Sequence, residues 1–542
     1  MTELFKRLVK KRGLSEHFLK PKYDECIDPF FLPDMEKAVG RIKKAKENKD
    51  RVLIYGDYDV DGVTASTLMF DVLSGVGIKD IEIMLPNRFS DGYGMSDKVL
   101  KEAKKKQINL VVTVDCGSRN HEIIKEFNEL GIDVIVTDHH ECDDILPEAA
   151  AVVNPKRKDC KNKDLKDLAG VGVAFKLAQA VTKEKMMRNG QEKWLLDLVL
   201  IGTICDSMKM TEENRRLCYF GMKVLKKTRR VGLSELIKVC QAKRINSELI
   251  GFRIGPRLNA SGRMATAERS LQLLMEKNSA EAARIARELN DLNGKRKAEQ
   301  EKTVNDILKT KEDLEKKDVV VVRGKWHEGV IGIAAGKIVE ELRKPAIVFA
   351  EKGEELKGSG RSYNDFNLVE ALEYCKKVII SGGGHSEACG VKIMPDNFDA
   401  FDKKMNEFYR KKIVKKQSNN KNNSEEIDIE DLSELSLDFF EELNELEPFA
   451  DGNEEPIFVL KNVLLINVRK MGKNNEHLGI RVRDKKGNMI KTVAFYASEK
   501  WMDFQEGQRA DVSIFVIEND FNGQKSVEGR IVKMRLVEEE VF

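Results

Sequence analysis

Short apolar runs alternate with amphipathic segments between residues 51 and 154. Five runs rich in branched residues predict buried strands, namely VLIY (52–55), IEIML (81–85), LVVTV (110–114), VIVT (134–137) and AVV (151–153). Between them, the segments TASTLMFDVL, SDKVLKEAKKKQ and HEIIKEFNEL carry apolar residues at helical spacing. Strands that alternate with helices predict a parallel sheet covered by helices on both faces.

A long helical region follows, over residues 155–315. Within it, an apolar stripe on a heavily charged segment predicts one long helix, and the stripe comprises Ile285, Leu289, Leu292, Val304, Ile307 and Leu308. Two interpretations of this helix remain open: it connects two lobes, or it is an amphipathic helix packed on one of them.

A second α/β pattern extends from VVVV (319–322) to about Arg410, with the helical segment GVIGIAAGKIVEEL and the strand-like runs AIVFA and VIIS. The polar tract KKIVKKQSNNKNNSEE then predicts a flexible linker, and SLDFFEELNELE predicts an acidic helix. From Pro456 onward, five strand-like runs joined by turn signals predict a small β-barrel of the OB type. The runs are IFVLKNVLLI, LGIRVRD, MIKTVAF, ADVSIFVIE and SVEGRIVKMRL.

These patterns divide the chain into five parts. We expect a first α/β lobe (1–215), a helical connector that includes the long linking helix (216–316), a second α/β lobe (317–412), a polar linker with an acidic helix (413–445) and the OB-type barrel (446–542). The sequence ends soon after the fifth strand-like run, so no further domain is expected beyond the barrel.

Composition narrows the class of protein without naming partners. The chain has 542 residues with a formal net charge of +3. Basic and acidic residues are thus almost equal in number, which neither requires nor excludes a nucleic-acid partner. Nine cysteines without paired spacing argue against a disulfide framework and favour a reducing, cytoplasmic setting. The charged N-terminus does not resemble a secretory signal, and the longest apolar stretch, around residues 195–205, is too short to cross a membrane.

Acidic residues and histidines gather where the apolar runs end. VLIY leads into Gly56-Asp57-Tyr58-Asp59-Val60-Asp61-Gly62, LVVTV into Asp115, VIVT into Asp138-His139-His140, and DLVLIGTIC into Asp206. In open parallel sheets, the residues just past the carboxyl ends of the strands converge on one crevice. One such aspartate is usually a turn former, but four strands that each end in Asp or His predict a shared site.

So many carboxylates in one volume would repel each other and become protonated unless cations neutralised them. Oxygen ligands with an imidazole suit Mn²⁺ or Mg²⁺ better than structural zinc. Two ions about 3.5–4 Å apart could activate water and hold phosphoryl oxygens during an in-line displacement.

At these residues the chain resembles the DHH phosphoesterase superfamily and, within it, the RecJ family of single-stranded-DNA-specific exonucleases. GDYDVDG (56–62), VTVDCG (112–117), VTDHHE (136–141), LAGVGVAF (168–175) and GTICDS (202–207) resemble the motifs of the phosphoesterase lobe. IGPRLNASGR (254–263), WHEGVIGIAAGK (326–337), KGSGRS (357–362), SGGGHSEACG (381–390) and LEPFADGNEEPIF (446–458) resemble the later RecJ motifs. The ordered set spans more than 400 residues, so the resemblance is specific.

The resemblance implies a DHH phosphoesterase lobe, a DHH-associated lobe and an OB-fold domain, and it implies roles for single residues. The implied metal ligands are Asp57, Asp59, Asp61, Asp115, His139 and Asp206. His140 is similar to the family histidine beside the scissile phosphate, where it would hydrogen-bond the phosphate or assist proton transfer. His385 and Arg361 would also act near the reacting phosphate.

Other residues resemble those that hold the nucleic acid. Arg88, Ser359 and Arg361 are similar to residues that grip the 5′-terminal phosphate, a task that suits the planar fork of arginine. Gly382, Gly383 and Gly384, followed by His385, would let the backbone approach the strand closely. Arg257, Asn259 and Arg263 either contact the strand or tie the lobes together, and both interpretations remain open.

The implied activity is 5′-to-3′ hydrolysis of single-stranded DNA to nucleoside 5′-monophosphates with two Mn²⁺ or Mg²⁺ ions, in DNA repair and recombination. The implied partners are single-stranded DNA, a RecQ-type helicase and a single-stranded-DNA-binding protein, with no membrane and a monomeric chain. The barrel would bind the strand through Phe495, Tyr496 and Phe515 with Lys461, Arg469, Arg481 and Arg483, although most aromatic residues of such a barrel belong to its core. Two departures from the family pattern, Cys116 after the second-strand aspartate and FADGNEEP before the barrel, remove no implied ligand.

Three alternatives compete with this interpretation. A short-oligonucleotide or cyclic-dinucleotide phosphodiesterase would typically lack the long helical middle and the barrel. A non-catalytic replication scaffold would be expected to have lost several acidic ligands. A manganese-dependent inorganic pyrophosphatase would need no nucleic-acid-binding tail.

Overall fold

The computed structural model describes residues 1–91, 94–413, 426–473, 475–497 and 499–537. The chain forms two compact units: the larger comprises residues 28–206 and 224–420, and the smaller comprises residues 1–27, 207–223 and 421–542. Most of the predicted polar linker, residues 414–425, lies outside the described residues.

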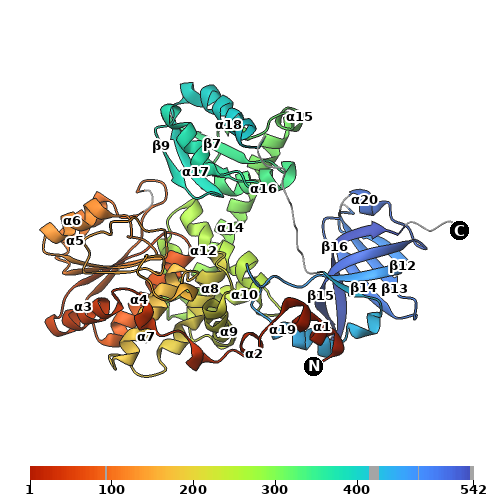
Figure 1. Cartoon of the computed structure of the whole chain (residues 1–542), viewed down its shortest axis with the longest axis horizontal. Coiled ribbons are helices and arrows are strands. Elements are labelled where there is room, and N and C mark those ends of the chain that lie inside the picture. Colours follow the sequence, from red (N-terminus) through yellow and green to blue (C-terminus); the bar gives the residue numbers. More distant parts are fainter. Residues whose placement is uncertain (92–93, 414–425, 474, 498, 538–542) are drawn as a thin grey trace. The chain divides into compact units, whose positions relative to one another are not determined.

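The larger unit contains the predicted parallel sheet, which is coloured orange in Figure 1. Its strand order is β2-β1-β3-β4-β5. Its strands are β1 (Val52–Tyr55), β2 (Ile81–Met84), β3 (Leu110–Val114), β4 (Asp133–Thr137) and β5 (Ala151–Val153). Alternate strand residues pack against α5 (Asp97–Lys105) and α6 (His121–Glu129) on one face. The other face is covered by α3 (Met35–Asn48), α4 (Val60–Val76) and α7 (Gly170–Lys183). Helices therefore lie on both faces, as the alternating pattern predicts.

Two details of this lobe differ from the prediction. The run IEIML does not form a buried strand, because β2 is an edge strand whose residues are only half buried. The run that ends at Asp206 is not a strand but the helix α8 (Leu196–Cys205), nine of whose ten residues are buried. A short run that is apolar on every side fits a buried helix as well as a buried strand, so its pattern alone did not distinguish the two.

Helices dominate the middle of the chain, as predicted. They are α9 (Glu212–Leu225), α10 (Val231–Val239), α11 (Ser247–Leu249), α12 (Gly255–Met264), α13 (Glu268–Met275), α14 (Ser279–Leu308) and α15 (Lys311–Leu314). The first half of α14 packs on α10 and α12, and its last turns, around Ile307, enter the core of the second lobe. The long helix is therefore both amphipathic and a connection between the lobes.

The second lobe has a mixed sheet with the order β6-β7-β8-β10-β9. Its strands are β6 (Val320–Gly324), β7 (Ala346–Lys352), β8 (Glu355–Arg361), β9 (Ser381–Gly384) and β10 (Ala388–Ile393). The helix α16 (Ile331–Leu342) covers one face, while α17 (Leu368–Tyr374) and α18 (Phe398–Ile413) cover the other. The run VIIS is not a strand as predicted, because a 3₁₀ turn occupies Lys376–Val378 and the strand begins only at Ser381.

The smaller unit contains the predicted five-stranded barrel. It is formed by β12 (Phe458–Met471), β13 (His477–Arg483), β14 (Met489–Ala494), β15 (Arg509–Phe521) and β16 (Gln524–Leu536), and β12 also pairs with β15, which closes the barrel. The short strand β11 (Ile427–Ile429) adds to β12, and the predicted acidic helix is α19 (Leu437–Asn444). The N-terminal helix α1 (Glu3–Arg12) buries Leu4, Phe5 and Leu8 in the same core.

Among the described residues, no helix combines the length and apolar character that crossing a bilayer requires. All nine cysteines are free thiols.

Candidate metal centre and phosphate-binding residues

The turn between β1 and α4 carries three of the predicted ligands in a backbone that glycine makes possible. Asp59 is the N-cap of α4, and its Oδ1 accepts a hydrogen bond of 3.0 Å from the Gly62 amide. A Cβ on Gly62 would lie 2.5 Å from the carbonyl oxygen of Asp57, so only glycine fits there. The first turn of the helix is thereby folded tightly under the carboxylates.

Asp61 is held by the next helix in this face of the sheet. Its Oδ2 accepts a hydrogen bond of 2.6 Å from the amide of Gly170, and its Oδ1 accepts one of 2.9 Å from the amide of Val171. These amides open α7, where free N–H groups and the helix dipole favour a negative charge. The motif LAGVGVAF therefore acts by fixing the orientation of Asp61.

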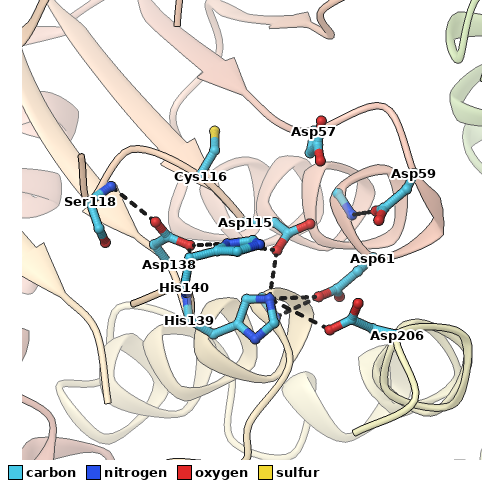
Figure 2. A network of polar contacts seen from close by, with 12 residues as sticks. Asp57, Asp59, Asp61, Asp115, Cys116, Ser118, Asp138, His139, His140 and Asp206 are labelled. Carbon is cyan, nitrogen blue, oxygen red and sulfur yellow. Dashed lines mark hydrogen bonds and ion pairs between the residues drawn. The ribbon is translucent and has the colours of Figure 1, made fainter. Parts of the chain in front are cut away.

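The other predicted ligands meet at the same edge of the sheet (Figure 2). His139 Nε2 lies 3.1 Å from Asp115 Oδ1, 3.6 Å from Asp206 Oδ2 and 3.9 Å from Asp61 Oδ2. Three groups among the described residues hold their ligand atoms within 4.8 Å of one another: Asp57 with Asp59 and Asp115, Asp61 with His139 and Asp206, and Asp115 with His139 and His140. The structure thus brings all six predicted metal ligands together, although Asp206 comes from the end of a helix and not from a strand.

Burial and mutual repulsion oppose ionisation of these carboxyls. Burial and the charge of Asp59 raise the pKa of Asp57 to about 7 and that of Asp61 to about 7. Burial, with the charges of Asp61 and Asp59, raises the pKa of Asp206 to about 8, and the pKa of Asp115 rises well above its ordinary value for the same kind of reason. The protein has thus gathered anionic groups that it does not itself neutralise.

The donor set fits hard divalent ions. Asp115 Oδ1 is buried and makes no hydrogen bond, and Asp115 adopts a left-handed backbone with φ of 61° that turns its side chain into the cluster. Burial and the positive charge of His140 lower the pKa of His139 to about 3, which keeps its imidazole neutral and able to donate a lone pair. Five carboxylates and one imidazole are the ligands expected for Mn²⁺ or Mg²⁺.

His140 is oriented by a residue whose role the sequence did not reveal. Its Nδ1 lies 2.8 Å from Asp138 Oδ1, and Asp138 also accepts a hydrogen bond of 3.0 Å from the Ser118 amide. Burial lowers the pKa of His140, but the hydrogen bond and charge of Asp138 outweigh it and raise that pKa to about 9. Asp138 is the first letter of the DHH triplet, so the motif contained the signal, yet its pattern did not distinguish a ligand from an orienting carboxylate.

Three predicted phosphate-binding arginines from separate elements lie near one another in the larger unit. The guanidinium of Arg88 lies 4.3 Å from the ring centre of Tyr58, and its buried Nε has no hydrogen-bond partner. Burial and the positive charges of Arg88, Arg296 and Arg361 lower the pKa of Arg263 to about 9. Within the described residues, none of these arginines forms an ion pair with a carboxylate. Such a cluster has the charge that a phosphate group would neutralise.

The motif KGSGR explains how β8 presents two of the predicted phosphate-binding residues, Ser359 and Arg361. Ser359 and Arg361 share one face of the strand, while Gly358 and Gly360 lie on the other face against Phe349 and Cys389. A Cβ on either glycine would lie within 2.6 Å of those side chains. The glycines therefore let the strand lie close to its core while its polar residues point the other way.

The remaining predicted residues lie in or beside β9 and in α12. Gly383 and Gly384 lie in the exposed edge strand β9, and the exposed His385 follows them. The partial burial of His385 and the charge of His140 lower the pKa of His385, so it lies within electrostatic range of His140. Arg257 donates from Nε and Nη2 to Asn290 Oδ1 at 3.2 and 3.0 Å, while Asn259 is half buried in α12.

Comparisons with known proteins follow the same division of the chain. The model of the DHH family, N-terminal domain, matches residues 51–203, that of the DHHA1 domain matches 316–411, and that of the RecJ OB domain matches 427–533. The single-stranded-DNA-specific exonuclease RecJ of Bacillus subtilis (strain 168) is 34% identical over 555 residues, which cover 100% of this chain and 69% of the relative.

Two solved structures are similar over almost the whole chain. The crystal structure of RecJ in complex with Mn²⁺ from Thermus thermophilus has a TM-score of 0.82 at 28% identity and covers 98% of this chain and 75% of that one. The corresponding complex with Mg²⁺ has a TM-score of 0.77 at 25% identity, with coverage of 99% and 75%. Both structures were solved with an ion of the class that suits the donor set found here.

Prediction for the metal centre: Asp115→Asn removes one buried carboxylate but keeps a residue type that tolerates the left-handed backbone. Without metal, the variant should melt at or above the wild-type temperature, because repulsion is relieved. Added Mn²⁺ should raise the melting temperature of the wild type by an amount equivalent to about 2.7 kcal/mol at a hundredfold excess over Kd, and that of the variant much less.

The control for this measurement is Asp144→Asn, which removes an exposed carboxylate paired with Lys158 in the loop after β4. It should respond to Mn²⁺ as the wild type does. A full Mn²⁺ shift in Asp115→Asn would remove this aspartate from the ligand set.

Proposed function

The chain belongs to the RecJ family of single-stranded-DNA-specific exonucleases, and we propose that it hydrolyses single-stranded DNA from the 5′ end, releasing nucleoside 5′-monophosphates. The observation that carries the proposal is the convergence of five aspartates and His139 at one edge of the first sheet. Clustered carboxylates beside unpaired arginines suit the cleavage of a phosphodiester, whose charge requires cations on several sides.

Two sets of ligands are proposed to hold two Mn²⁺ or Mg²⁺ ions. Asp57, Asp59 and Asp115 form one set, while Asp61, His139 and Asp206 form the other, with Asp115 near enough to His139 to serve both. Bound divalent ions would neutralise the phosphoryl oxygens and lower the pKa of a water molecule to make it nucleophilic. Gly170 and Val171 support the second set by holding Asp61 in place.

His140 is proposed to donate a proton or a hydrogen bond to the reacting phosphodiester. Its pKa of about 9 and its contact through Nδ1 with Asp138 favour the imidazolium form, which is able to donate a proton. His385, within electrostatic range of His140, is proposed to face the same phosphate, and the exposed Gly383 and Gly384 would let the strand pass close to β9.

Polarity would follow from recognition of the chain end. Arg88, Ser359 and Arg361 are proposed to hold the 5′-terminal phosphate, while Arg257, Asn259 and Arg263 contact the strand nearby. The absence of ion-pair partners for Arg88, Arg263 and Arg361 within the described residues supports this assignment, since a phosphate would satisfy their unused donors. Arg361 would then also align the scissile bond with the metal ligands.

The barrel is proposed to hold the strand outside the active site. Phe495 and Tyr496 are 56% and 82% exposed, and their ring centres lie 5.4 and 5.0 Å from that of His477. Arg469, Arg481 and Arg483 are exposed as well. Phe515 and Lys461 are weaker candidates, because Phe515 is half buried under Arg530 and Lys461 pairs with Asp428 and Asp511.

The biological setting is part of the proposal. A single-strand-specific nuclease requires a helicase to open duplex, so a RecQ-type helicase and a single-stranded-DNA-binding protein are fitting partners in DNA repair and recombination. The chain is proposed to act as a monomer in the cytoplasm. The four domain boundaries after residues 215, 316, 412 and 445 remain proposals, with the family models supporting the three folded regions.

Prediction for activity: an oligonucleotide labelled at its 5′ end should release the label as a mononucleotide in the first turnovers, with Mn²⁺ or Mg²⁺ present. The same oligonucleotide labelled at its 3′ end should keep the label in progressively shorter fragments. Blunt duplex should resist, and Asp115→Asn should release no label from either substrate. First release of the 3′ label, or equal digestion of duplex, would refute the proposed polarity or strand specificity.

Prediction for the barrel: Tyr496→Ala should weaken binding of single-stranded DNA by about 1–3 kcal/mol if one base stacks on the ring. Binding is measured by fluorescence anisotropy in EDTA, so that no hydrolysis occurs. Met489→Ala is the control, because this residue is 57% exposed at the start of β14, whereas Tyr496 follows the end of that strand. Equal affinities of both variants would exclude stacking on Tyr496.

A further inference from the structure

The motif WHEGV contributes neither a predicted ligand nor a phosphate-binding side chain, yet it lies between two elements that do. Its turn, residues 326–329, follows β6 and leads into α16 of the second lobe. Arg263, in the helical connector, contacts this turn directly at Gly329. Arg88, in the first lobe, is followed by Phe89, whose ring contacts His327 of the turn.

On one side, the turn lies flush against the end of α12. A Cβ on Gly329 would lie 1.9 Å from the carbonyl oxygen of Arg263, so no other residue could approach so closely. Arg263 Nη1 in turn donates to the Gly329 carbonyl at 3.4 Å. Backbone and side chain of Arg263 are thus both fixed by one glycine.

On the other side, the turn meets the residue next to Arg88. The ring of His327 packs edge-on against Phe89 with centres 5.8 Å apart. Lys357 Nζ donates to the carbonyl oxygen of Phe89 at 3.3 Å and to Glu328 Oε2 at 2.9 Å. Glu328, whose side chain is only 8% exposed, also pairs with Lys352 at 2.9 Å. A buried carboxylate therefore holds Lys357 where it can reach the Phe89 carbonyl.

Lys357 belongs to the strand that carries the proposed phosphate-binding residues. Lys357, Ser359 and Arg361 are alternate residues of β8 and share one face. The loop that carries Arg88 is otherwise braced by Asp91, which accepts a hydrogen bond of 3.0 Å from the Asn87 amide. Lys357 therefore ties the Arg88 loop to the strand that presents Arg361.

We propose that Lys357, held by Glu328, is a positioning residue that sets Arg88 against Ser359 and Arg361 and thereby determines the preference for a 5′-phosphorylated end. The inference rests on the proposed role of Arg88 in holding that phosphate. Lys357 does not touch the substrate; it acts through the backbone beside Arg88. A contact that only joined the lobes would affect all substrates equally, whereas this one should affect substrates that carry the terminal phosphate.

The experiment compares single-stranded oligonucleotides with a 5′-phosphate and with a 5′-hydroxyl, and measures the ratio of their kcat/KM values. Lys357→Met keeps the aliphatic stem and removes the donor. The ratio should fall about ten-fold, the order expected when one charge-assisted contact is lost, mainly through a higher KM for the phosphorylated substrate. Activity on the hydroxyl substrate should stay within two-fold of the wild type, and Lys357→Arg should restore the ratio.

The matched control is Lys392→Met. Lys392 is exposed, lies directly opposite Lys357 in β10 and shares its face of the sheet, so its loss changes the local charge equally without touching Phe89. Its ratio should remain within two-fold of the wild type. Equal losses in both variants would overturn the inference, since long-range charge would then explain the effect.

A double-mutant cycle tests whether Lys357 acts through Arg88. Arg88→Ala should abolish the preference, and adding Lys357→Met to it should change the ratio no further. Additive losses would overturn the inference, as would an unchanged ratio in Lys357→Met. A wild type that cleaves DNA but has no preference for the phosphate would contradict the role of Arg88 and this inference together. A wild type without Mn²⁺-dependent cleavage would contradict the proposed function itself.

Discussion

Repulsion among buried carboxylates governs the chemistry of this protein. Asp57, Asp61, Asp115 and Asp206 have pKa values raised by burial and by one another, so the site is costly to hold in the charged form without cations. Hydrogen bonds from the first amides of α7 to Asp61, and from the Gly62 amide to the N-cap Asp59 of α4, offset part of that cost. A fold that holds carboxylates this close together favours the binding of divalent cations, which reduce the repulsion between them.

A cluster of positively charged arginines lies in the same unit as the carboxylates. Arginines from the loop after β2, from α12 and from β8 lie near one another without carboxylate partners among the described residues. Burial and the charges of the neighbouring arginines lower the pKa of Arg263. The carboxylate cluster lacks cations and the arginine cluster lacks an anion. A phosphate chain with bound metal ions would neutralise both clusters. The turn at Gly329 and the bridge of Lys357 give this arrangement its rigidity.

Much of this was predictable, because both the strand ends and the residues that follow them are local features of the sequence. Asp115 and His139 could be placed at one edge once the sheet was known to be parallel. Asp206 was placed there for a partly wrong reason, since the apolar run before it is a helix. The role of Asp138 depends on its side-chain rotamer, which no local sequence pattern predicts. The packing of α1 in the barrel core depends on contacts between residues more than 400 positions apart, which a local pattern does not predict either.

The most direct test of the central claim is an anomalous difference map at the manganese edge from crystals grown with Mn²⁺. The account predicts two peaks roughly 3.5–4 Å apart, one among Asp57, Asp59 and Asp115 and the other among Asp61, His139 and Asp206. The account would be contradicted by a map that shows fully occupied Mn²⁺ ions elsewhere in the crystal but no peak among these side chains.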